Sequence, residues 1–278
     1  KKRKRIFDGG SFIASVDDQD DDNGDGKKDY LIQPDWVASH IKYFRSPRGS
    51  KYAPSCKRPS HWYKTSIFDI ERKKYQTNKS VDKSYSGIGW KWNRGHLASR
   101  ADSNRLGAEY GCNSHVFANA IPQNAKLNQG IWLGLENYVS SLANEYGEVW
   151  VVAGPIYEKG KKIRYIGEKH KNELQVGIPD KVFKVIFIET SNKSGVGVIS
   201  FIFQNKFKSG QMPKNYKTGN CQKDQKYDYT PNFVSLSDIE KATGLSFFAD
   251  DPELAQLKDL KATGLPRVTK KHSVGYCR

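Results

Sequence analysis

The stretch that decides the fold starts at Asn93-Arg94-Gly95-His96 and resumes at Pro122-Gln123-Asn124-Ala125-Lys126-Leu127-Asn128-Gln129-Gly130. It then runs into an apolar, periodic segment at residues 131–143 that contains Glu136. In this order the chain supplies an imidazole, an amide oxygen and a carboxylate. These groups suit a hydrolysis that is assisted by one hydrated divalent metal ion. No other constellation in the chain is as specific.

Charge points to the kind of partner. The 278 residues include 46 Lys and Arg against 30 Asp and Glu, which gives a net charge of +16 and a pI near 9.5. A polyanion is the expected ligand, and nucleic acid is favoured over heparin-like polymers or an anionic membrane. The alternative is a basic surface that serves solubility alone. No apolar run approaches the ~20 residues that span a bilayer, so we expect no membrane partner.

The four cysteines are Cys56, Cys112, Cys221 and Cys277, and none forms a C-x-x-C pair. We therefore expect two disulfides in a secreted or periplasmic protein, with Cys56–Cys112 and Cys221–Cys277 preferred among three possible pairings. Four free thiols in a cytosolic protein are the alternative. The basic cluster at residues 1–5 has no apolar segment behind it, which is consistent with a mature form whose signal peptide has been removed.

Composition divides the chain into a basic N-terminus with an acidic loop at residues 1–29 and a single domain at residues 30–278. Asp21, Asn23 and Asp25 are spaced like the first three ligands of a calcium loop, which suggests a Ca²⁺ site. The twelfth position of such a loop needs a carboxylate but falls on Ile32. A solvated acidic loop is the alternative, and it is the one we favour.

Periodicity predicts an α+β fold with a central antiparallel or mixed sheet and flanking helices. β-branched and aromatic runs predict buried strands at residues 149–153, 182–188 and 196–203, and a strand at residues 84–92 that leads into the Asn93 motif. Helical spacing predicts a helix at residues 129–144, and a capping box from Ser237 predicts another that stops at Gly244. Residues 206–226 are expected to form a surface loop.

Each site residue has a chemical reason and an alternative. His96 could act as a general base because its ordinary pKa lies near neutrality, although a lone histidine is more often a packed residue. Asn128 offers one oxygen to a hard cation, or it caps the following helix. Glu136 would lie ~12 Å farther along a straight helix, so an outer role, holding a metal-bound water, fits it better.

These motifs resemble those of the DNA/RNA non-specific endonuclease family, the group with a ββα-metal active site that includes endonuclease G. The similarity covers roughly residues 85–250 and rests on several ordered motifs. They are Asn93-Arg94-Gly95-His96, Asn119-Ala120-Ile121-Pro122-Gln123, Leu127-Asn128-Gln129-Gly130, Leu135-Glu136, residues 151–157 and residues 239–248.

The resemblance implies a role for each matching position. His96 would be the general base, Asn128 the direct Mg²⁺ ligand (with Mn²⁺ as a substitute), Glu136 the holder of metal-bound water, and Asn119 a residue that orients the site. Arg58 is the best candidate for an arginine that stabilises the transition state, with Arg45 and Arg48 as alternatives. Arg94, Arg100 and Asn93 are assigned to contacts with nucleic acid, and Arg94 could instead support the His96 loop.

Two positions depart from the family pattern. Asn93 stands where most members have aspartate, and Ser140 stands where some carry a helix arginine. We expect Asn93 to keep the hydrogen-bonding role while lowering the pKa of His96 slightly.

The sequence thus predicts a secreted endonuclease that hydrolyses double- and single-stranded DNA and RNA and leaves 5′-phosphate and 3′-hydroxyl ends. The alternatives are a catalytically weakened nucleic-acid-binding protein of the same fold and a DNA-only nuclease.

Overall fold

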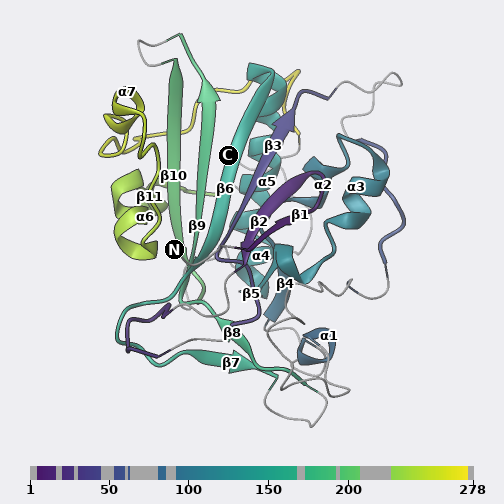
Figure 1. Cartoon of the computed structure of the whole chain (residues 1–278). Helices are drawn as coiled ribbons and strands as arrows, with labels where there is room; N and C mark the ends of the chain where they lie inside the picture. The colour runs from purple at the N-terminus through teal and green to yellow at the C-terminus, as the bar shows by residue number, and fades with distance from the viewer. Residues whose placement is uncertain are drawn as a thin grey trace.

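The computed structural model describes residues 5–16, 21–27, 31–44, 53–59, 62, 81–85, 92–167, 173–191, 195–206 and 227–274. Its centre is a seven-stranded sheet in the order β1-β2-β3-β6-β9-β10-β11, and every neighbouring pair in it is antiparallel (Figure 1). The strands are β1 (Arg5–Asp8), β2 (Phe12–Val16), β3 (Trp36–Lys42), β6 (Glu148–Ile156), β9 (Lys181–Glu189), β10 (Val196–Gln204) and β11 (Phe233–Val234).

Both faces of this sheet are covered. The long helix α5 (Ile131–Tyr146) packs on one face, and α6 (Leu236–Thr243) with α7 (Pro252–Ala255) lies on the other side (Figure 1). Alternate residues of β9 show the two faces, because Val182 and Ile186 join the core under α5 whereas Phe183 and Val185 pack with α6. A strand that is buried on both faces is expected to be mostly apolar, and β9 is apolar except for Lys184 and its two terminal residues, Lys181 and Glu189.

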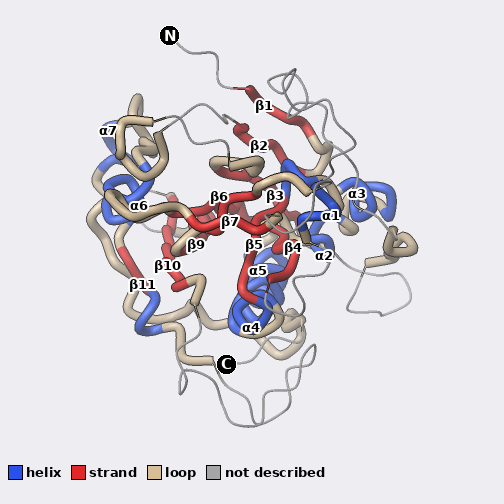
Figure 2. The backbone as a smooth tube through the Cα atoms, turned by 90° about the horizontal axis from the view of Figure 1, so that it is seen from below, coloured by secondary structure: helices blue, strands red, loops and turns tan. Residues whose placement is uncertain are grey.

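Smaller elements lie beside the main sheet. Hairpin β4 (Trp92–His96) and β5 (Ala120–Asn124) is antiparallel, and so is β7 (Arg164–Ile166) with β8 (Val176–Ile178). The tube view from below shows β4 and β5 next to α5 (Figure 2). The short helices are α1 (Val81–Ser84), α2 (Arg100–Ser103), α3 (Ala108–Asn113), α4 (Ala125–Asn128), and the 3₁₀ turns η4 (Phe117–Asn119) and η5 (Thr230–Asn232).

The predicted α+β class, the three buried strands and the long helix are confirmed, with boundaries that move by at most three residues. Of the strand predicted at residues 84–92, Ser84 ends helix α1 and Trp92 belongs to strand β4, whereas residues 86–91 lie outside the described residues. Strand β4 carries the Asn-Arg-Gly-His motif itself. Register explains this position, because residues 92–96 pair one for one with residues 124–120 of β5.

Two helix starts also differ from the prediction. The capping box of α6 uses Ser235 and Asp238, whose side chains and backbone amides bond reciprocally, so the cap lies two residues before Ser237. Its predicted end is confirmed, since Gly244 adopts the left-handed conformation there. Asn128 is not the cap of α5. It ends the separate helix α4, and Gly130 occupies the cap position.

The N-terminal residues contribute to the sheet, since residues 5–16 form β1 and β2 at its edge. The division at residue 29 stays a prediction, and residues 207–226 of the predicted loop lie outside the described residues. In the acidic loop, oxygens of the Asp21 and Asn23 side chains accept backbone amides of Asp25 and Gly26. A Ca²⁺ site there remains untested. None of the helices in the described part of the chain has the length and apolar character that crossing a bilayer requires.

Candidate active site

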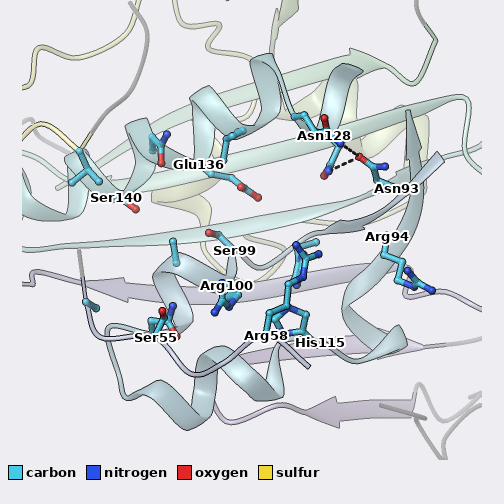
Figure 3. Close-up of a pocket in the computed structure, with 18 of the residues that line it drawn as sticks. Ser55, Arg58, Asn93, Arg94, Ser99, Arg100, His115, Asn128, Glu136 and Ser140 are labelled. Carbon is cyan, nitrogen blue, oxygen red and sulfur yellow. Dashed lines mark hydrogen bonds between the residues drawn. The ribbon is translucent and has the colours of Figure 1, made fainter. Parts of the chain in front are cut away.

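Strand β4, helices α2 and α5 and the segment around Arg58 contribute side chains to the lining of a cavity of about 910 Å³. His96, Asn93, Asn128 and Glu136 all line it. Figure 3 shows Asn128 and Glu136 on one side of the cavity, and Arg58, Arg100 and His115 on the opposite side. Residues that are distant in sequence meet there because the antiparallel pairing sets the start of β4, at Trp92 and Asn93, beside the end of β5 and therefore beside α4.

His96 ends β4 with its side chain only partly exposed. Its ring packs against Trp62, with centroids 4.6 Å apart, and lies edge-on to His115 at 4.9 Å. Burial lowers the pKa of His96 well below its ordinary value, and the positive charges of Arg58 and Arg100 act in the same direction. The imidazole is therefore neutral at pH 7 and able to accept a proton.

Asn93 orients the side-chain amides of Asn128 and Gln129. Its Oδ1 accepts a hydrogen bond from Asn128 Nδ2 at 3.1 Å and another from Gln129 Nε2 at 2.9 Å (Figure 3). Since the Nδ2 group of Asn128 is held in this way, its Oδ1 is the atom of this side chain that could ligate a cation. An aspartate would accept the same two bonds, so the amide at position 93 preserves this arrangement without the charge.

The break between α4 and α5 removes the straight-helix spacing expected for Asn128 and Glu136. Glu136 projects from α5, and its Oε1 accepts a hydrogen bond from Trp132 Nε1 at 3.1 Å. Burial raises the pKa of Glu136 to about 7, opposed by the positive charge of Lys184. Lys184 is 2% exposed, and its Nζ lies 4.1 Å from the centre of the Trp132 ring. A metal ion bound near Glu136, in addition to Lys184, would favour the ionised form of this carboxylate.

Ser140, which replaces the helix arginine of some relatives, takes part in a buried polar contact. Its Oγ donates to Asp102 Oδ1 at 2.5 Å, and Arg105 Nε lies 3.6 Å from the same oxygen. Arg105 also donates to the carbonyl oxygens of Ser140 and Lys42, which ties α5 to β3. The guanidinium group of Arg105 therefore lies beside position 140. It comes from the turn that follows α2 and not from α5.

Arg58 lies in a segment that is tied to the site by a disulfide. Cys56 and Cys112 are bonded, with Cα atoms 5.9 Å apart, as the preferred pairing predicted. Arg100 donates to the carbonyl oxygen of Cys56 at 2.6 Å, and the charge of Arg58 contributes to lowering the pKa of Arg100, after burial. Two guanidinium groups therefore share this side of the cavity. The predicted Cys221–Cys277 pair lies outside the described residues.

Two predicted site residues have structural partners. Arg94 donates to Asp82 Oδ1 at 2.7 Å and lies 5.3 Å from the Tyr85 ring centre, which suits a support for the loop. Asn119 is fully buried and does not line the cavity. Its Oδ1 accepts the amide of Ala98, and its Nδ2 donates to the carbonyl oxygens of Ala98 and Ser114. It therefore holds the backbone that follows His96.

Sequence reasoning missed three residues at the site, namely Gln129, His115 and Lys184. Gln129 follows Asn128 directly within the motif of residues 127–130, and this position next to the proposed ligand could have indicated its role. His115 is a single histidine without a motif. Lys184 interrupts the apolar run of β9, and a buried lysine in such a run was the one sign that it had a partner inside the fold.

Comparisons with known proteins identify the family of the chain. A family model described as DNA/RNA non-specific endonuclease matches residues 28–254, which is most of the chain. The chain belongs to this family. The structure of the EndoG/EndoGI complex contains a similar chain, with a TM-score of 0.61, 20% identity, and coverage of 89% of this chain and 86% of that one. This likeness shows the fold alone, which is that of the ββα-metal nucleases.

Curated relatives are more similar in sequence. Mitochondrial nuclease EXOG of Danio rerio is 30% identical over 82% of this chain and 59% of its own length. Mitochondrial endonuclease G of Homo sapiens is 29% identical over 66% of this chain and 56% of its own length. Nuclease C1 of Cunninghamella echinulata var. echinulata is 29% identical over 66% of each chain. For the EXOG relatives the chain spans about half of their length.

Proposed function

We propose that this member of the nuclease family is an endonuclease that hydrolyses phosphodiester bonds of DNA and RNA. The observation that carries the proposal is the meeting of His96, an oriented Asn128 and the Glu136 carboxylate around one cavity. Two arginines, Arg58 and Arg100, line the same cavity. Contacts of this kind address the sugar-phosphate backbone and not the bases, in keeping with action on any sequence.

The residues present fit a hydrated Mg²⁺ or Mn²⁺ ion. Within the described residues no group of three His, Cys, Asp or Glu side chains could hold a metal. The cavity instead offers the amide oxygen of Asn128 and the carboxylate of Glu136. Mg²⁺ commonly takes one or two protein ligands and keeps most of its waters. Asn128 would ligate the ion directly and Glu136 would hold its hydration water. When bound, the ion would neutralise charge that develops on the phosphate and its leaving oxygen.

His96 would accept the proton of the attacking water. Its Nε2 is buried, so Nδ1 is the ring nitrogen left to reach a water in the cavity. The water oxygen would form a bond to phosphorus as the P–O3′ bond breaks, and His96 would take up the water's proton at Nδ1. A solvent water would donate a proton to the leaving O3′, which gives a 3′-hydroxyl, and the other fragment keeps a 5′-phosphate. General-base catalysis contributes typically 10²- to 10⁴-fold to such a step.

Arg58 is the proposed stabiliser of the transition state, because its segment is fixed beside the cavity by the disulfide. Its rivals Arg45 and Arg48 lie outside the described residues. Arg100 would share the contact with phosphate. Arg94 would support the loop through Asp82 rather than bind substrate. A disulfide is typical of oxidising compartments, and this supports the proposal of a secreted or periplasmic protein.

Digestion of plasmid DNA and of RNA in parallel tests this function. We expect both substrates to be cleaved with Mg²⁺, with no cleavage when EDTA is present. His96→Ala and Asn128→Ala should each lose at least about 100-fold in rate. His40→Ala is a matched control, because His40 pairs with Glu148 on the main sheet, outside the cavity.

The outcome separates the alternatives. A wild-type protein that binds nucleic acid without cleaving it would be the weakened binding protein suggested by Asn93 and Ser140. Cleavage of DNA with intact RNA would identify a DNA-only nuclease. Full activity in both cavity variants would refute the proposed roles.

A further inference from the structure

The last described segment of the chain, residues 265–274, has no role in the mechanism above. It contains no helix or strand, and it lies beyond residues 28–254, which match the family model. In Figure 1 this yellow segment passes the end of α5 that precedes β6. We name residues 265–274 the C-terminal strap, because they are bound along the second half of that helix.

Hydrogen bonds fix the strap to α5. Near the start of the strap, the hydroxyl group of Tyr138 donates to the carbonyl oxygen of Pro266 at 2.9 Å. In its middle, the backbone amide and the hydroxyl group of Thr269 each donate to Glu145 Oε2 at 2.9 Å. His272 Nδ1 lies 2.9 Å from the same oxygen. Bonds at both ends of this helix segment therefore hold the strap in one position.

The end of the strap forms part of the cavity wall. Val274 is 4% exposed, its amide donates to Ser141 Oγ at 2.8 Å, and it lines the cavity together with Ser140. Figure 3 shows Ser140 at the end of the cavity opposite to Asn128. Glu145 lies five residues beyond Ser140, about 8 Å farther along the helix. A strand that leaves the cavity over Ser140 would reach the strap within about three nucleotides, at 3.4 Å each.

The strap presents positive charge that the protein itself does not use. Three of its basic side chains are exposed, namely Arg267, Lys270 and Lys271. In the described part of the chain, none of them forms an ion pair with a carboxylate. The neighbouring carboxylate, Glu145, is bound by Thr269 and His272 of the strap. These three cations are thus available to contact phosphates.

An exposed aromatic ring lies beside these cations. Tyr43 directly follows β3 and is 45% exposed, and its ring lies edge-on to that of His272, with centroids 6.4 Å apart. The backbone amide of Tyr43 donates to the carbonyl oxygen of Gly147 at 2.6 Å, which fixes its position at the end of α5. A fixed ring that is open to solvent is a surface on which an unpaired base can stack. Bases within a duplex are already stacked on one another and do not present this face.

We propose that the C-terminal strap and Tyr43 bind the single-stranded nucleic acid that extends from the cavity, with phosphates at Arg267, Lys270 and Lys271 and a base stacked on Tyr43. The inference deepens the proposed function and rests on it, because the cavity defines where this strand begins. Phosphate contacts position a strand without reading its sequence, and stacking accepts every base. The surface would therefore favour single strands as substrates without making cleavage sequence-specific.

The first test measures phosphate contacts through salt. Metal-free protein is titrated with a fluorescent oligo-dT of about 12 nucleotides, a length within the range of such sites, at several salt concentrations. Each phosphate contact on a single strand contributes about 0.7 to the slope of log Kd against log salt, so Lys270→Gln with Lys271→Gln should lower this slope by about 1.4. Lys159→Gln with Lys162→Gln is the matched control, because both lysines are exposed between β6 and β7 and do not line the cavity. A strap variant with the wild-type slope overturns the phosphate contacts and leaves these charges a role in solubility alone.

The second test measures stacking through the bases. Tyr43→Leu removes the ring but keeps an apolar side chain, and it should weaken binding of oligo-dT by about 5- to 10-fold. Binding of an abasic strand of the same length, which has phosphates but no bases, should match the wild type, and so should binding of a duplex. Tyr43→Phe keeps the ring and should bind oligo-dT as the wild type does. Thermal unfolding shows whether each variant is folded.

An equal loss on oligo-dT, the abasic strand and the duplex, or no loss on oligo-dT in the folded Leu variant, would overturn the role of Tyr43. Failure of the proposed function has a different signature, which is a wild type that binds oligo-dT but does not cleave it with Mg²⁺. The titrations still decide the role of the strap in that case, because they need neither metal nor turnover.

Discussion

Restoring the common aspartate, Asn93→Asp, tests how the active site sets the pKa of its base. The substitution keeps the acceptor for Asn128 and Gln129 and adds one negative charge. Position 93 is three residues from His96 on strand β4, which is about 10 Å at strand spacing. Across that distance a unit charge changes the energy of the imidazolium by about 0.4 kcal/mol in water and about 1.7 kcal/mol at an effective dielectric constant of 20.

These energies correspond to a rise of about 0.3 to 1.2 units in the pKa of His96. Since the base works only when deprotonated, a higher pKa moves the acidic limb of the kcat/KM profile toward higher pH. The wild-type protein, whose His96 pKa is lowered by burial and by neighbouring arginines, should thus stay active at lower pH than the variant. The variant should also bind Mg²⁺ more tightly, because a charged acceptor strengthens the bonds that orient Asn128.

The assay measures kcat/KM against pH, at saturating Mg²⁺, with a fluorescent oligonucleotide. Gln204→Glu is the control, because it makes the same change in net charge at an exposed position on β10 that does not line the cavity. The control profile should match the wild type. An acidic limb that stays in place in Asn93→Asp would refute the electrostatic reasoning, and so would an equal shift in the control.

Three further outcomes are expected. Mg²⁺ binding at pH 6 should release close to one proton, because burial raises the pKa of Glu136 to about 7 and the metal site needs the ionised carboxylate. Calorimetry in buffers of different ionisation enthalpy measures the number of protons released. The variant Glu136→Gln should release none. The double substitution Cys56→Ser and Cys112→Ser removes a disulfide that closes a loop of 56 residues, and it should lower the free energy of unfolding by about 4 kcal/mol in denaturant titrations. It should also lower kcat, because Arg58 is then no longer held beside the cavity. An unchanged kcat would contradict the placement of Arg58. Binding of a short duplex by metal-free protein should weaken linearly in log Kd against log salt, and a flat plot would rule out recognition through phosphates.

Much of the fold was readable from local patterns. Strand β9 was recognisable because it is apolar on both faces, and helix α5 because its apolar residues recur at helical spacing. The pairing of residues 92–96 with residues 120–124 was not predicted, since it depends on contacts far apart in sequence. Likewise, the cap of α6 moved to Ser235 because two good capping residues were available two positions apart.

The active site divides in the same way. His96, Asn128 and Glu136 were found because each belongs to a short ordered motif. His115 and Lys184 were not found, because each is a single residue whose meaning comes from a ring or carboxylate on another element. Asn119 was found by its motif, but only its hydrogen bonds to the backbone at Ala98 show how it acts.

The amino-acid sequence by itself determined the class of fold, the positive charge and the chemical groups of the site, because these depend on residue type and short-range spacing. Only the tertiary structure decided that Nε2 of His96 is buried, that Asn93 holds Asn128, and that Lys184 lies near Glu136. The physical reason is that hydrogen bonding and burial act through space. A pKa or a tautomer depends on neighbours that the packing of helix α5 and hairpin β4–β5 brings together.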